Sequence, residues 1–311
     1  MLNKPTEELN KRISDKIEMI TQALEDNLPK APLEIMIIEE ALSYSLFAGG
    51  KRVRPLLLVL CGELCGAKKE QLLSSACAVE FIHTYSLIHD DLPVIDNDDL
   101  RRGKPTSHKV FGDAIAVLAG DAFLTHAFGL LTMYKNDLTN KLLALLIEGA
   151  GINGMLGGQV ADIIAEKEKP TRDKLDFIHE RKTGALIKTA VLMGGAVAGA
   201  NDVIMKHLEV YSMKTGLAFQ VIDDILDEIG DEKKLGKKVG KDKGKNKCTY
   251  PAVYGIDKSK EIASELTESA SAELKIIRDL VLKTHLGKTD IINNAYEDLT
   301  ILTNFILQRI Y

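Results

Sequence analysis

The chain has 311 residues and a formal net charge of −5, with 45% hydrophobic and 27% charged residues. This composition is typical of a soluble globular protein with a sizeable core, and it excludes a disordered chain. The overall charge gives no reason to expect nucleic acid or an anionic membrane as a partner. No linker divides the sequence, so we expect one domain, although two intimate halves are also compatible with the length.

The N-terminus and the apolar segments both favour a cytoplasmic protein. Residues 1–20 mix charged and apolar side chains at helical spacing, unlike a signal peptide. The apolar stretch 112–133 is interrupted by Asp113, Asp121 and His126, so we expect no membrane span. Four cysteines lack the paired spacing of a zinc site and are expected to be reduced and buried: Cys61, Cys65, Cys77 and Cys248.

Apolar residues recur at spacings of three and four almost throughout, whereas alternating strand patterns and Asn-Gly hairpins are missing. The sequence therefore predicts an all-α protein. We expect helices over residues 5–27, 33–47, 54–65, 70–92, 108–134, 138–165, 171–199, 202–229, 249–255, 258–285 and 288–310.

The first of two acidic clusters starts at Asp90 and Asp91 and continues through Asp96. On a straight helix Asp90 and Asp96 lie on nearly opposed faces. Pro93 disfavours helical geometry before it, so we expect the helix to kink or end there and Asp96 to return toward Asp90. His83 lines the Asp90 face two turns earlier.

The second acidic cluster lies within an apolar helical stretch. Asp223 and Asp227 are four residues apart and share a helix face, Gln220 extends that face, and Asp224 lies to one side. Carboxylates beside apolar neighbours need a compensating charge, so the two clusters suggest one shared divalent-metal site. A solvent-facing acidic stripe is the alternative.

Basic residues occur in separate sets, which together suit the binding of more than one phosphate group. For any single set, surface charge is the simpler explanation. The basic segment 233–247 is either a solvated loop or a lid over the bound phosphate groups. The sets are Lys51, Arg52 and Arg54; Arg101 and Arg102; Lys182 beside Thr183; and Lys237.

Several ordered motifs resemble the signature of the trans-isoprenyl diphosphate synthases. They are Gly50–Pro55, His89–Thr106, Lys182–Gly184, Phe219–Asp227, Leu235–Lys237 and Lys247–Pro251. The resemblance implies an all-α fold around a deep central cavity, assembled as a homodimer. It also implies Mg²⁺-assisted ionisation of an allylic diphosphate, attack by the alkene of isopentenyl diphosphate, and loss of a proton.

The resemblance also implies roles for individual residues. Three Mg²⁺ ions are expected, with Asp90, Asp96, Asp223, Asp227 and Asp91 as ligands. The allylic diphosphate is expected at Arg101, Lys182 and Lys237, and isopentenyl diphosphate at Lys51, Arg54, His83 and Arg102. Thr183 and Gln220 are expected to position the substrate or stabilise the cation. Asp90, Asp96, Asp223, Lys182 and Arg101 form the expected catalytic set.

Product length is expected to depend on Tyr85 and Ser86, which precede the first acidic cluster. A ring at Tyr85, about 7–8 Å below Asp90 along a helix, would block a growing tail. This arrangement resembles the bacterial farnesyl type, so farnesyl diphosphate is the expected product, with geranylgeranyl or geranyl diphosphate as alternatives. Tyr85 is equally compatible with a purely structural role in the core.

Two other classes of protein remain to be separated from this one. A terpene cyclase or a squalene-synthase-like enzyme also uses acidic motifs, but the set Lys51–Arg54 resembles a dedicated isopentenyl diphosphate site. A regulatory subunit of a prenyl synthase is the non-enzyme alternative, and the intact carboxylates argue against it.

Overall fold

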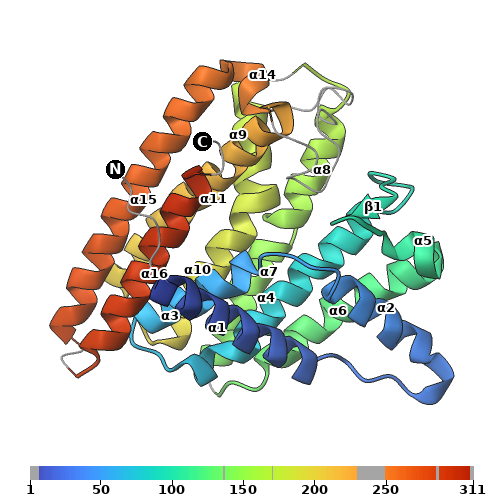
Figure 1. Cartoon of the computed structure of the whole chain (residues 1–311). Helices are drawn as coiled ribbons and strands as arrows, with labels where there is room; N and C mark the ends of the chain where they lie inside the picture. The colour runs from blue at the N-terminus through green and yellow to red at the C-terminus, as the bar shows by residue number, and fades with distance from the viewer. Residues whose placement is uncertain (1–6, 136, 170, 230–248, 285–286, 309–311) are drawn as a thin grey trace.

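The computed structural model describes residues 7–135, 137–169, 171–229, 249–284 and 287–308, and these form an almost entirely helical protein, as predicted (Figure 1). The first part of the chain contains α1 (Glu7–Asp26), η1 (Leu33–Ile35), α2 (Met36–Leu46), α3 (Val53–Leu64), α4 (Lys69–Asp90), β1 (Leu100–Arg101), β2 (Lys104–Pro105), α5 (Ser107–Phe111) and α6 (Asp113–Leu131). The second part contains α7 (Asp137–Ala150), α8 (Met155–Ala165), α9 (Arg172–His179), η2 (Glu180–Gly184), α10 (Ala185–Val197), α11 (Asp202–Ile229), α14 (Tyr250–Tyr254), α15 (Ile256–Thr284) and α16 (Thr289–Gln308).

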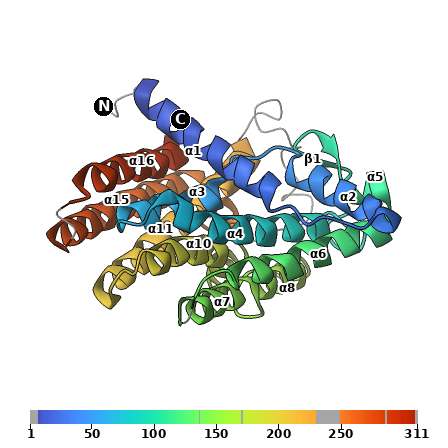
Figure 2. The same ribbon diagram turned by 90° about the horizontal axis from the view of Figure 1, so that it is seen from below.

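Helices α3, α4 and α10 form the centre of the bundle, and the other long helices surround them (Figure 2). Every residue of α3 from Pro55 onward is buried, and α10 is buried over most of its length. A helix that is apolar on all sides is stable only when other elements cover it. Helix α6 packs along α4, α16 contacts α3, and α15 packs along α11, which carries the second acidic cluster.

Two predicted helices are divided in the structure, and a third changes its helical form. The predicted helix 108–134 breaks at Gly112, whose φ of 82° lies in the left-handed region. The predicted helix 138–165 breaks between Ala150 and Met155. The predicted helix 171–199 is continuous, but it contains a π-helical turn, η2, between α9 and α10.

A short hairpin between the acidic cluster and α5 contains the two strands of this otherwise helical fold within the described residues. Leu100 pairs with Pro105 and Arg101 with Lys104. The two turn residues, Arg102 and Gly103, have φ values of 54° and 77°. Two consecutive positive φ values are typical of the tight turns that match the twist of a hairpin. This turn directs Arg101 and Arg102 to different partners.

The loop before α3 is fixed by a buried ion pair. Arg52 has a φ of 49° and is 6% exposed, and its guanidinium donates to Glu80 Oε1 at 2.6 Å and to the Leu46 carbonyl at 2.6 Å. Removal of either charged partner leaves the other charge buried without compensation. The pair therefore attaches the loop that carries Lys51 and the start of α3, with Arg54, to α4.

Three of the four cysteines lie within the described residues, and all three are free and buried, as predicted. Burial raises the pKa of the Cys65 and Cys77 thiols to about 12. Cys248 lies outside the described residues.

Candidate active site

The first acidic cluster lies where α4 ends and the chain turns back on itself. Helix α4 ends at Asp90, and the Asp96 backbone N–H then donates to the Asp90 carbonyl at 2.9 Å. The N–H of Asp98 reaches the Asp91 carbonyl at 3.2 Å. Asp96 thus returns to Asp90, as Pro93 predicted, and both side chains remain partly accessible.

The side chain of Asp91 is held by Arg101 of the hairpin. Its side chain is 5% exposed, and Arg101 Nε lies 2.8 Å from both carboxylate oxygens while Nη2 donates to Oδ1 at 2.5 Å. Because Arg101 covers both oxygens, Asp91 is a weaker metal-ligand candidate than the sequence indicated. The pair fixes the orientation of Arg101, whose side chain remains 32% exposed.

Asp90 carries a charge that its surroundings compensate poorly. Burial raises the pKa of Asp90 to about 6, and the charges of Asp96 and Asp91 add to this effect. Lys182 and Arg101 oppose the increase. A bound cation would stabilise the ionised form of such a carboxylate.

The second acidic cluster lies on α11 and is linked to the π turn. Thr183 donates to Gln220 Oε1 at 2.7 Å, and the Gln220 amide donates to Asp224 Oδ1 at 2.9 Å. Asp224 also accepts the Tyr250 backbone N–H at 2.9 Å and is 4% exposed. Asp224 therefore supports the site from behind, whereas Asp223, the predicted ligand, is partly accessible. Asp227 is 5% exposed.

A buried histidine lies behind the second cluster. His179 Nε2 is 3.5 Å from Asp224 Oδ2, and the imidazole ring packs edge-on against Tyr250. Burial lowers the pKa of His179 to about 4, so the imidazole is neutral at physiological pH and its contact with Asp224 is not an ion pair. The sequence pattern predicts no role for His179.

The π turn η2 connects the two acidic clusters. Lys182 lies close enough to Asp90 for its charge to lower the pKa of that carboxyl, and Thr183, the next residue, contacts Gln220 of α11. Lys182 Nζ also donates to Asp162 Oδ2 of α8 at 2.6 Å. A π-helical turn contains one residue more than an α-helical turn and so changes the direction of the side chains that follow. Such turns are frequent at functional sites.

A group of cations gathers beside the acidic clusters. Arg54 donates from Nη1 to His83 Nε2 at 3.3 Å. Burial, together with the charges of Arg54, Arg102, Arg101 and Arg52, lowers the pKa of His83 well below its usual value, so the imidazole is neutral. Burial likewise lowers the pKa of Arg54. Cations gathered at this density favour a bound anion.

Two glycines allow the loop before α3 to wrap around Arg102. Gly49 and Gly50 have φ values of 113° and 124°, and the Gly49 carbonyl accepts a hydrogen bond from Arg102. A Cβ atom at Gly50 would lie 2.5 Å from Arg102 Nη1. Lys51 follows on the surface, with its ammonium 5.8 Å from the centre of the Phe305 ring of α16.

The carboxylates of the candidate site suit Mg²⁺ only when a substrate supplies further oxygen ligands. Within the described ranges, no three His, Cys, Asp or Glu side chains converge to form a cation site. Mg²⁺ is usually held by one or two carboxylates together with water and phosphate oxygens, rather than by an all-protein cage. Asp90, Asp96 and Asp223 therefore suit Mg²⁺ that arrives with, or is completed by, a diphosphate.

Tyr85 and Ser86 lie on α4, within two turns of Asp90. Tyr85 is 7% exposed, and its ring packs edge-on against His89 with 5.7 Å between ring centres. Burial and the Asp90 charge raise the pKa of Tyr85 to about 12. Ser86 Oγ donates to the His83 carbonyl at 2.9 Å. Tyr85 belongs to the main core cluster, which is compatible with both of its predicted roles.

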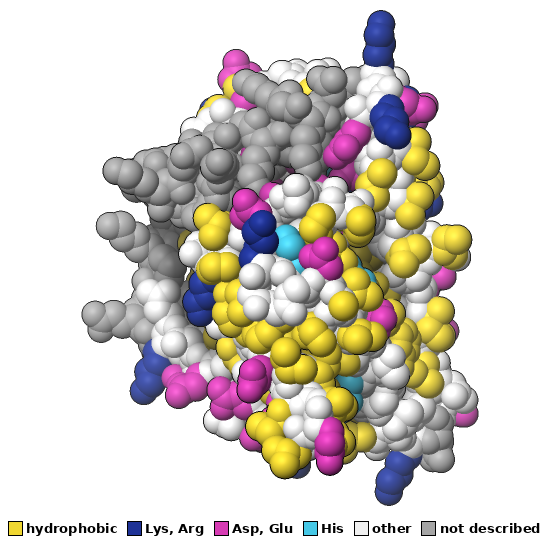
Figure 3. Space-filling view, turned by 90° about the vertical axis from the view of Figure 1, so that its right-hand side faces the viewer, with side chains coloured by type: hydrophobic (Ala, Val, Ile, Leu, Met, Phe, Trp, Pro, Cys, Tyr) yellow, Lys and Arg dark blue, Asp and Glu magenta, His cyan; other side chains and the backbone are white. Residues whose placement is uncertain are grey.

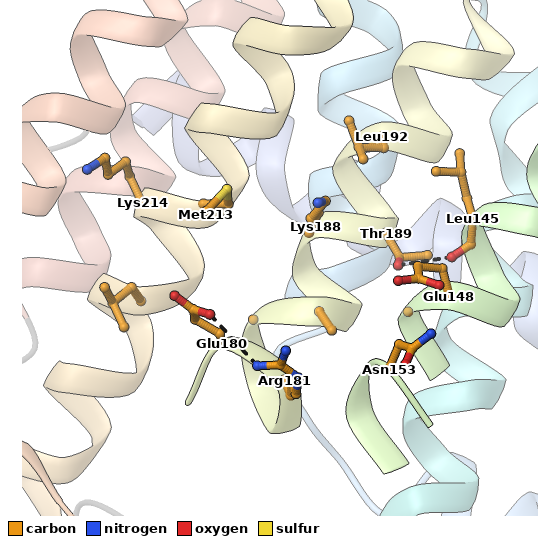
Figure 4. Close-up of a pocket in the computed structure, with 14 residues that line it drawn as sticks. Leu145, Glu148, Asn153, Glu180, Arg181, Lys188, Thr189, Leu192, Met213 and Lys214 are labelled. Atoms are coloured by element: carbon orange, nitrogen blue, oxygen red, sulfur yellow. Dashed lines mark hydrogen bonds and ion pairs between the residues drawn. The ribbon is translucent and has the colours of Figure 1, made fainter. Parts of the chain in front are cut away.

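The opposite side of the π turn borders a groove of about 370 Å³ between α7, α10 and α11 (Figure 4). Glu180, Arg181 and Gly184 line this groove together with apolar residues such as Met213. Lys182 and Thr183 contact Asp162 and Gln220 instead. The turn thus separates residues of the candidate site from residues of an outer groove.

Some expectations concern parts of the chain that the structure does not describe. Lys237 and the basic segment 233–247 lie outside the described residues. Asp162, in contrast, is described and was missed by the sequence analysis. Its signal is modest: Gly157, Gly158 and Gln159 precede it, and a glycine pair followed one turn later by a carboxylate indicates a close helix contact with a charged partner.

Comparison with known proteins identifies the family. Residues 35–282 match the polyprenyl synthetase family model. The chain belongs to the polyprenyl synthetase family. It is 47% identical over 265 residues to a geranylgeranyl pyrophosphate synthase of Catharanthus roseus, covering 83% of this chain and 73% of the relative. It is 44% identical over 265 residues to a geranylgeranyl diphosphate synthase of Cyanophora paradoxa, covering 84% and 88%.

Solved structures of this family have the same fold. An FPP/GFPP synthase from Zymomonas mobilis is 33% identical with a TM-score of 0.77, covering 94% of this chain and 99% of the other. A geranyltransferase from Helicobacter pylori, solved with magnesium and isoprenyl diphosphate, is 30% identical with a TM-score of 0.82, covering 99% of both chains. These findings show that the protein is a short-chain prenyltransferase of the trans-isoprenyl diphosphate synthase type.

A synthase site that concentrates negative charge is expected to reduce stability. The pKa of Asp90 in the fold, about 6, is above its usual 3.8, so ionised Asp90 destabilises the fold progressively from about pH 4 and fully above about pH 6. Asp90→Asn removes this cost. At pH 7 without Mg²⁺, the variant should therefore melt a few degrees above wild type in calorimetry, whereas at pH 4 the two should be similar.

The same substitution should lower turnover by orders of magnitude. The uncharged amide retains the shape of the carboxylate but is a poor ligand for a divalent cation. A lower melting temperature for Asp90→Asn at pH 7 would contradict the charge argument, and wild-type turnover would remove Asp90 from the catalytic set.

Proposed function

We propose that this protein condenses isopentenyl diphosphate with an allylic diphosphate in a Mg²⁺-dependent reaction and releases farnesyl diphosphate. The observation that carries the proposal is the π turn, through which Lys182 approaches Asp90 while Thr183 contacts Gln220 beside the second acidic cluster. This turn therefore links carboxylates and cations from helices that are far apart in the sequence. Dimethylallyl and geranyl diphosphate are the proposed primers.

The allylic substrate binds with its diphosphate at Lys182 and Arg101. Ionisation breaks the allylic C–O bond and leaves negative charge on the departing diphosphate, which these two cations stabilise. When bound at Asp90, Asp96 and Asp223, Mg²⁺ ions supply further positive charge to that leaving group, and three are proposed. Asp91 orients Arg101 through its bidentate pair.

Isopentenyl diphosphate binds at the neighbouring cation group formed by Arg54, His83, Arg102 and Lys51. Because His83 is neutral, it contributes a hydrogen-bonding nitrogen rather than a charge. The alkene attacks the allylic cation, forming the new C–C bond, and the released diphosphate takes the proton. The Thr183 hydroxyl and the Gln220 amide, joined by a hydrogen bond, are proposed to orient the substrate. Apolar helices around the site limit quenching by water.

Product length is proposed to depend on Tyr85, with Ser86 beside it on α4. The buried ring close to Asp90 supports farnesyl diphosphate as the product, because an aromatic side chain near the acidic cluster shortens the space for the tail. Geranylgeranyl diphosphate is the second candidate, and the names of the Catharanthus and Cyanophora relatives favour it.

A homodimer is proposed as the working form, in the cytoplasm. Helix α6 is apolar enough in length and composition to cross a membrane, with a mean hydropathy of 1.7, but its inner side packs against α4. Apolar side chains gather on the side of the molecule where α5 and α6 lie (Figure 3). Leu118 of α6 is 55% exposed, and Leu156 of α8 is 48% exposed. Exposed apolar surface of this kind favours association with a second copy.

The central prediction is chain elongation by the protein alone. Purified protein is incubated with isopentenyl diphosphate, geranyl diphosphate and Mg²⁺, and the hydrolysed products are sized by chromatography. Farnesol is the expected product, and chelation of Mg²⁺ should abolish its formation. Cyclic hydrocarbons would indicate a terpene cyclase, and the absence of any product would favour the regulatory subunit.

Replacement of the Tyr85 ring tests the limit on product length. Tyr85→Ala should shift the products toward geranylgeranyl and longer chains in the same assay, because it removes the ring that shortens the cavity. Tyr85→Phe keeps the ring and serves as the matched control, with unchanged product length. If wild type already forms geranylgeranyl diphosphate, or if the alanine variant forms the same product as wild type, another residue limits the chain.

The dimer is tested by a charge placed on its proposed surface. Leu118→Asp should shift the protein from dimer to monomer in sedimentation velocity, because an unpaired carboxylate buried in an interface is costly. Ile276→Asp on α15 introduces the same charge at an exposed apolar position elsewhere and should leave the dimer intact. A monomeric wild-type protein, or a dimer unchanged by Leu118→Asp, would contradict the proposed surface.

A further inference from the structure

Asp162 of α8 pairs with Lys182, a candidate catalytic cation. Its Oδ2 atom accepts a hydrogen bond from Lys182 Nζ at 2.6 Å, and the two side chains are 12% and 26% exposed. Ion pairs shielded from water in this way are screened much less by salt than surface pairs. The pair therefore restrains a side chain that otherwise has four flexible carbons.

Gly158 brings the backbones of α8 and the π turn together at this point. A Cβ atom on Gly158 would lie 2.2 Å from the backbone nitrogen of Lys182 and 2.6 Å from the Cα atom of Lys182. No side chain fits in that space. Gly158 and Asp162 are four residues apart and lie on the same face of α8. The glycine therefore sets the distance between the backbones, and the carboxylate one turn later meets the lysine side chain.

The Lys182 ammonium interacts electrostatically with two carboxylates, those of Asp162 and Asp90. Asp162 forms an ion pair with the ammonium, and the positive charge of Lys182 also acts to lower the pKa of Asp90 on α4. An ammonium released from Asp162 would be drawn toward Asp90 and Asp96. There it would compete with the divalent cations that those carboxylates are proposed to bind.

We propose that Asp162 is a positioning residue for the allylic diphosphate, because it holds the Lys182 ammonium at the edge of the first acidic cluster. This inference rests on the proposed function. Asp162 acts through Lys182 and has no direct contact with the reacting atoms. Its negative charge keeps Lys182 directed toward the departing diphosphate and leaves the carboxylates of Asp90 and Asp96 for metal.

The kinetic test is a double-mutant cycle of Asp162→Asn and Lys182→Ala. Asp162→Asn should raise KM for geranyl diphosphate and lower kcat by about tenfold or more, because misplaced catalytic groups have effects of this size. KM for isopentenyl diphosphate should not change. In the Lys182→Ala background, Asp162→Asn should have no further effect. Additive effects of the two substitutions, or equal changes in both KM values, would overturn the inference.

Asp162→Glu keeps the charge and should recover a large part of the loss seen with Asp162→Asn. This variant also carries the test if Asp162→Asn does not fold. Wild-type KM and kcat for the asparagine variant, or a glutamate variant no better than asparagine, would oppose the inference. Asp173→Asn removes an exposed carboxylate from α9 and is the matched control, with unchanged kinetics.

Two readouts do not require activity. Asp162→Asn should lower the melting temperature of the substrate-free protein more when Lys182 is present than in Lys182→Ala. It should also weaken calorimetric binding of inorganic pyrophosphate with Mg²⁺, but only when Lys182 is present. If wild type elongates no chain while this coupling is found, the proposed function fails and the ion pair stands. If wild type elongates chains and the coupling is absent, the role of Asp162 is wrong.

Discussion

The candidate site depends on the π turn between α9 and α10. This turn carries Lys182 toward the first acidic cluster and Thr183 toward the second, although the two clusters come from helices far apart in the sequence. A regular helix advances side chains by a constant angle, and a single inserted residue changes the direction of those that follow. The close approach at Gly158 and the bond between Thr183 and Gln220 fix the turn from two sides.

The candidate site contains acidic and basic groups whose charges are poorly compensated without bound ligands. Asp90 keeps a raised pKa because burial and like charge dominate over Lys182 and Arg101. In the neighbouring cation group, burial together with nearby arginines lowers the pKa values of Arg54 and His83. Each group is unfavourable alone, and a diphosphate accompanied by divalent cations would relieve both. The fold thus accepts a local loss of stability where substrates supply the compensating charges.

Local chemistry explains which features the sequence could predict. The helical periodicity, the end of α4 near Pro93 and the return of Asp96 toward Asp90 follow from rules that act over a few residues. The break at Gly112 and the hairpin turn at Arg102 and Gly103 were missed because the sequence does not show which residues adopt a positive φ. Arg102, for example, adopts that geometry while it donates to the Gly49 carbonyl.

The partners of the predicted residues required the three-dimensional structure. Asp91 carries the same side chain as Asp90, yet Arg101 covers it, whereas Asp90 stays partly accessible. Likewise the Asp224 carboxylate accepts hydrogen bonds from the Gln220 amide and the Tyr250 backbone N–H. Asp223, in contrast, is partly accessible on α11. The spacing of residues along a helix predicts only which face each carboxylate lies on. Whether a carboxylate is covered depends on another element that packs there, such as the hairpin at Asp91 or α14 at Asp224.

The same distinction applies to Tyr85 and to product length. Its ring belongs to the packed core and also lies close enough to Asp90 for the carboxylate to raise its pKa. A side chain at the boundary between core and cavity can limit a growing tail only if its neighbours prevent it from moving. His89, one turn later, packs against this ring and approaches the Val117 carbonyl of α6 at 3.0 Å. The proposed limit on product length therefore depends on the packing of α4 against α6 as well as on Tyr85.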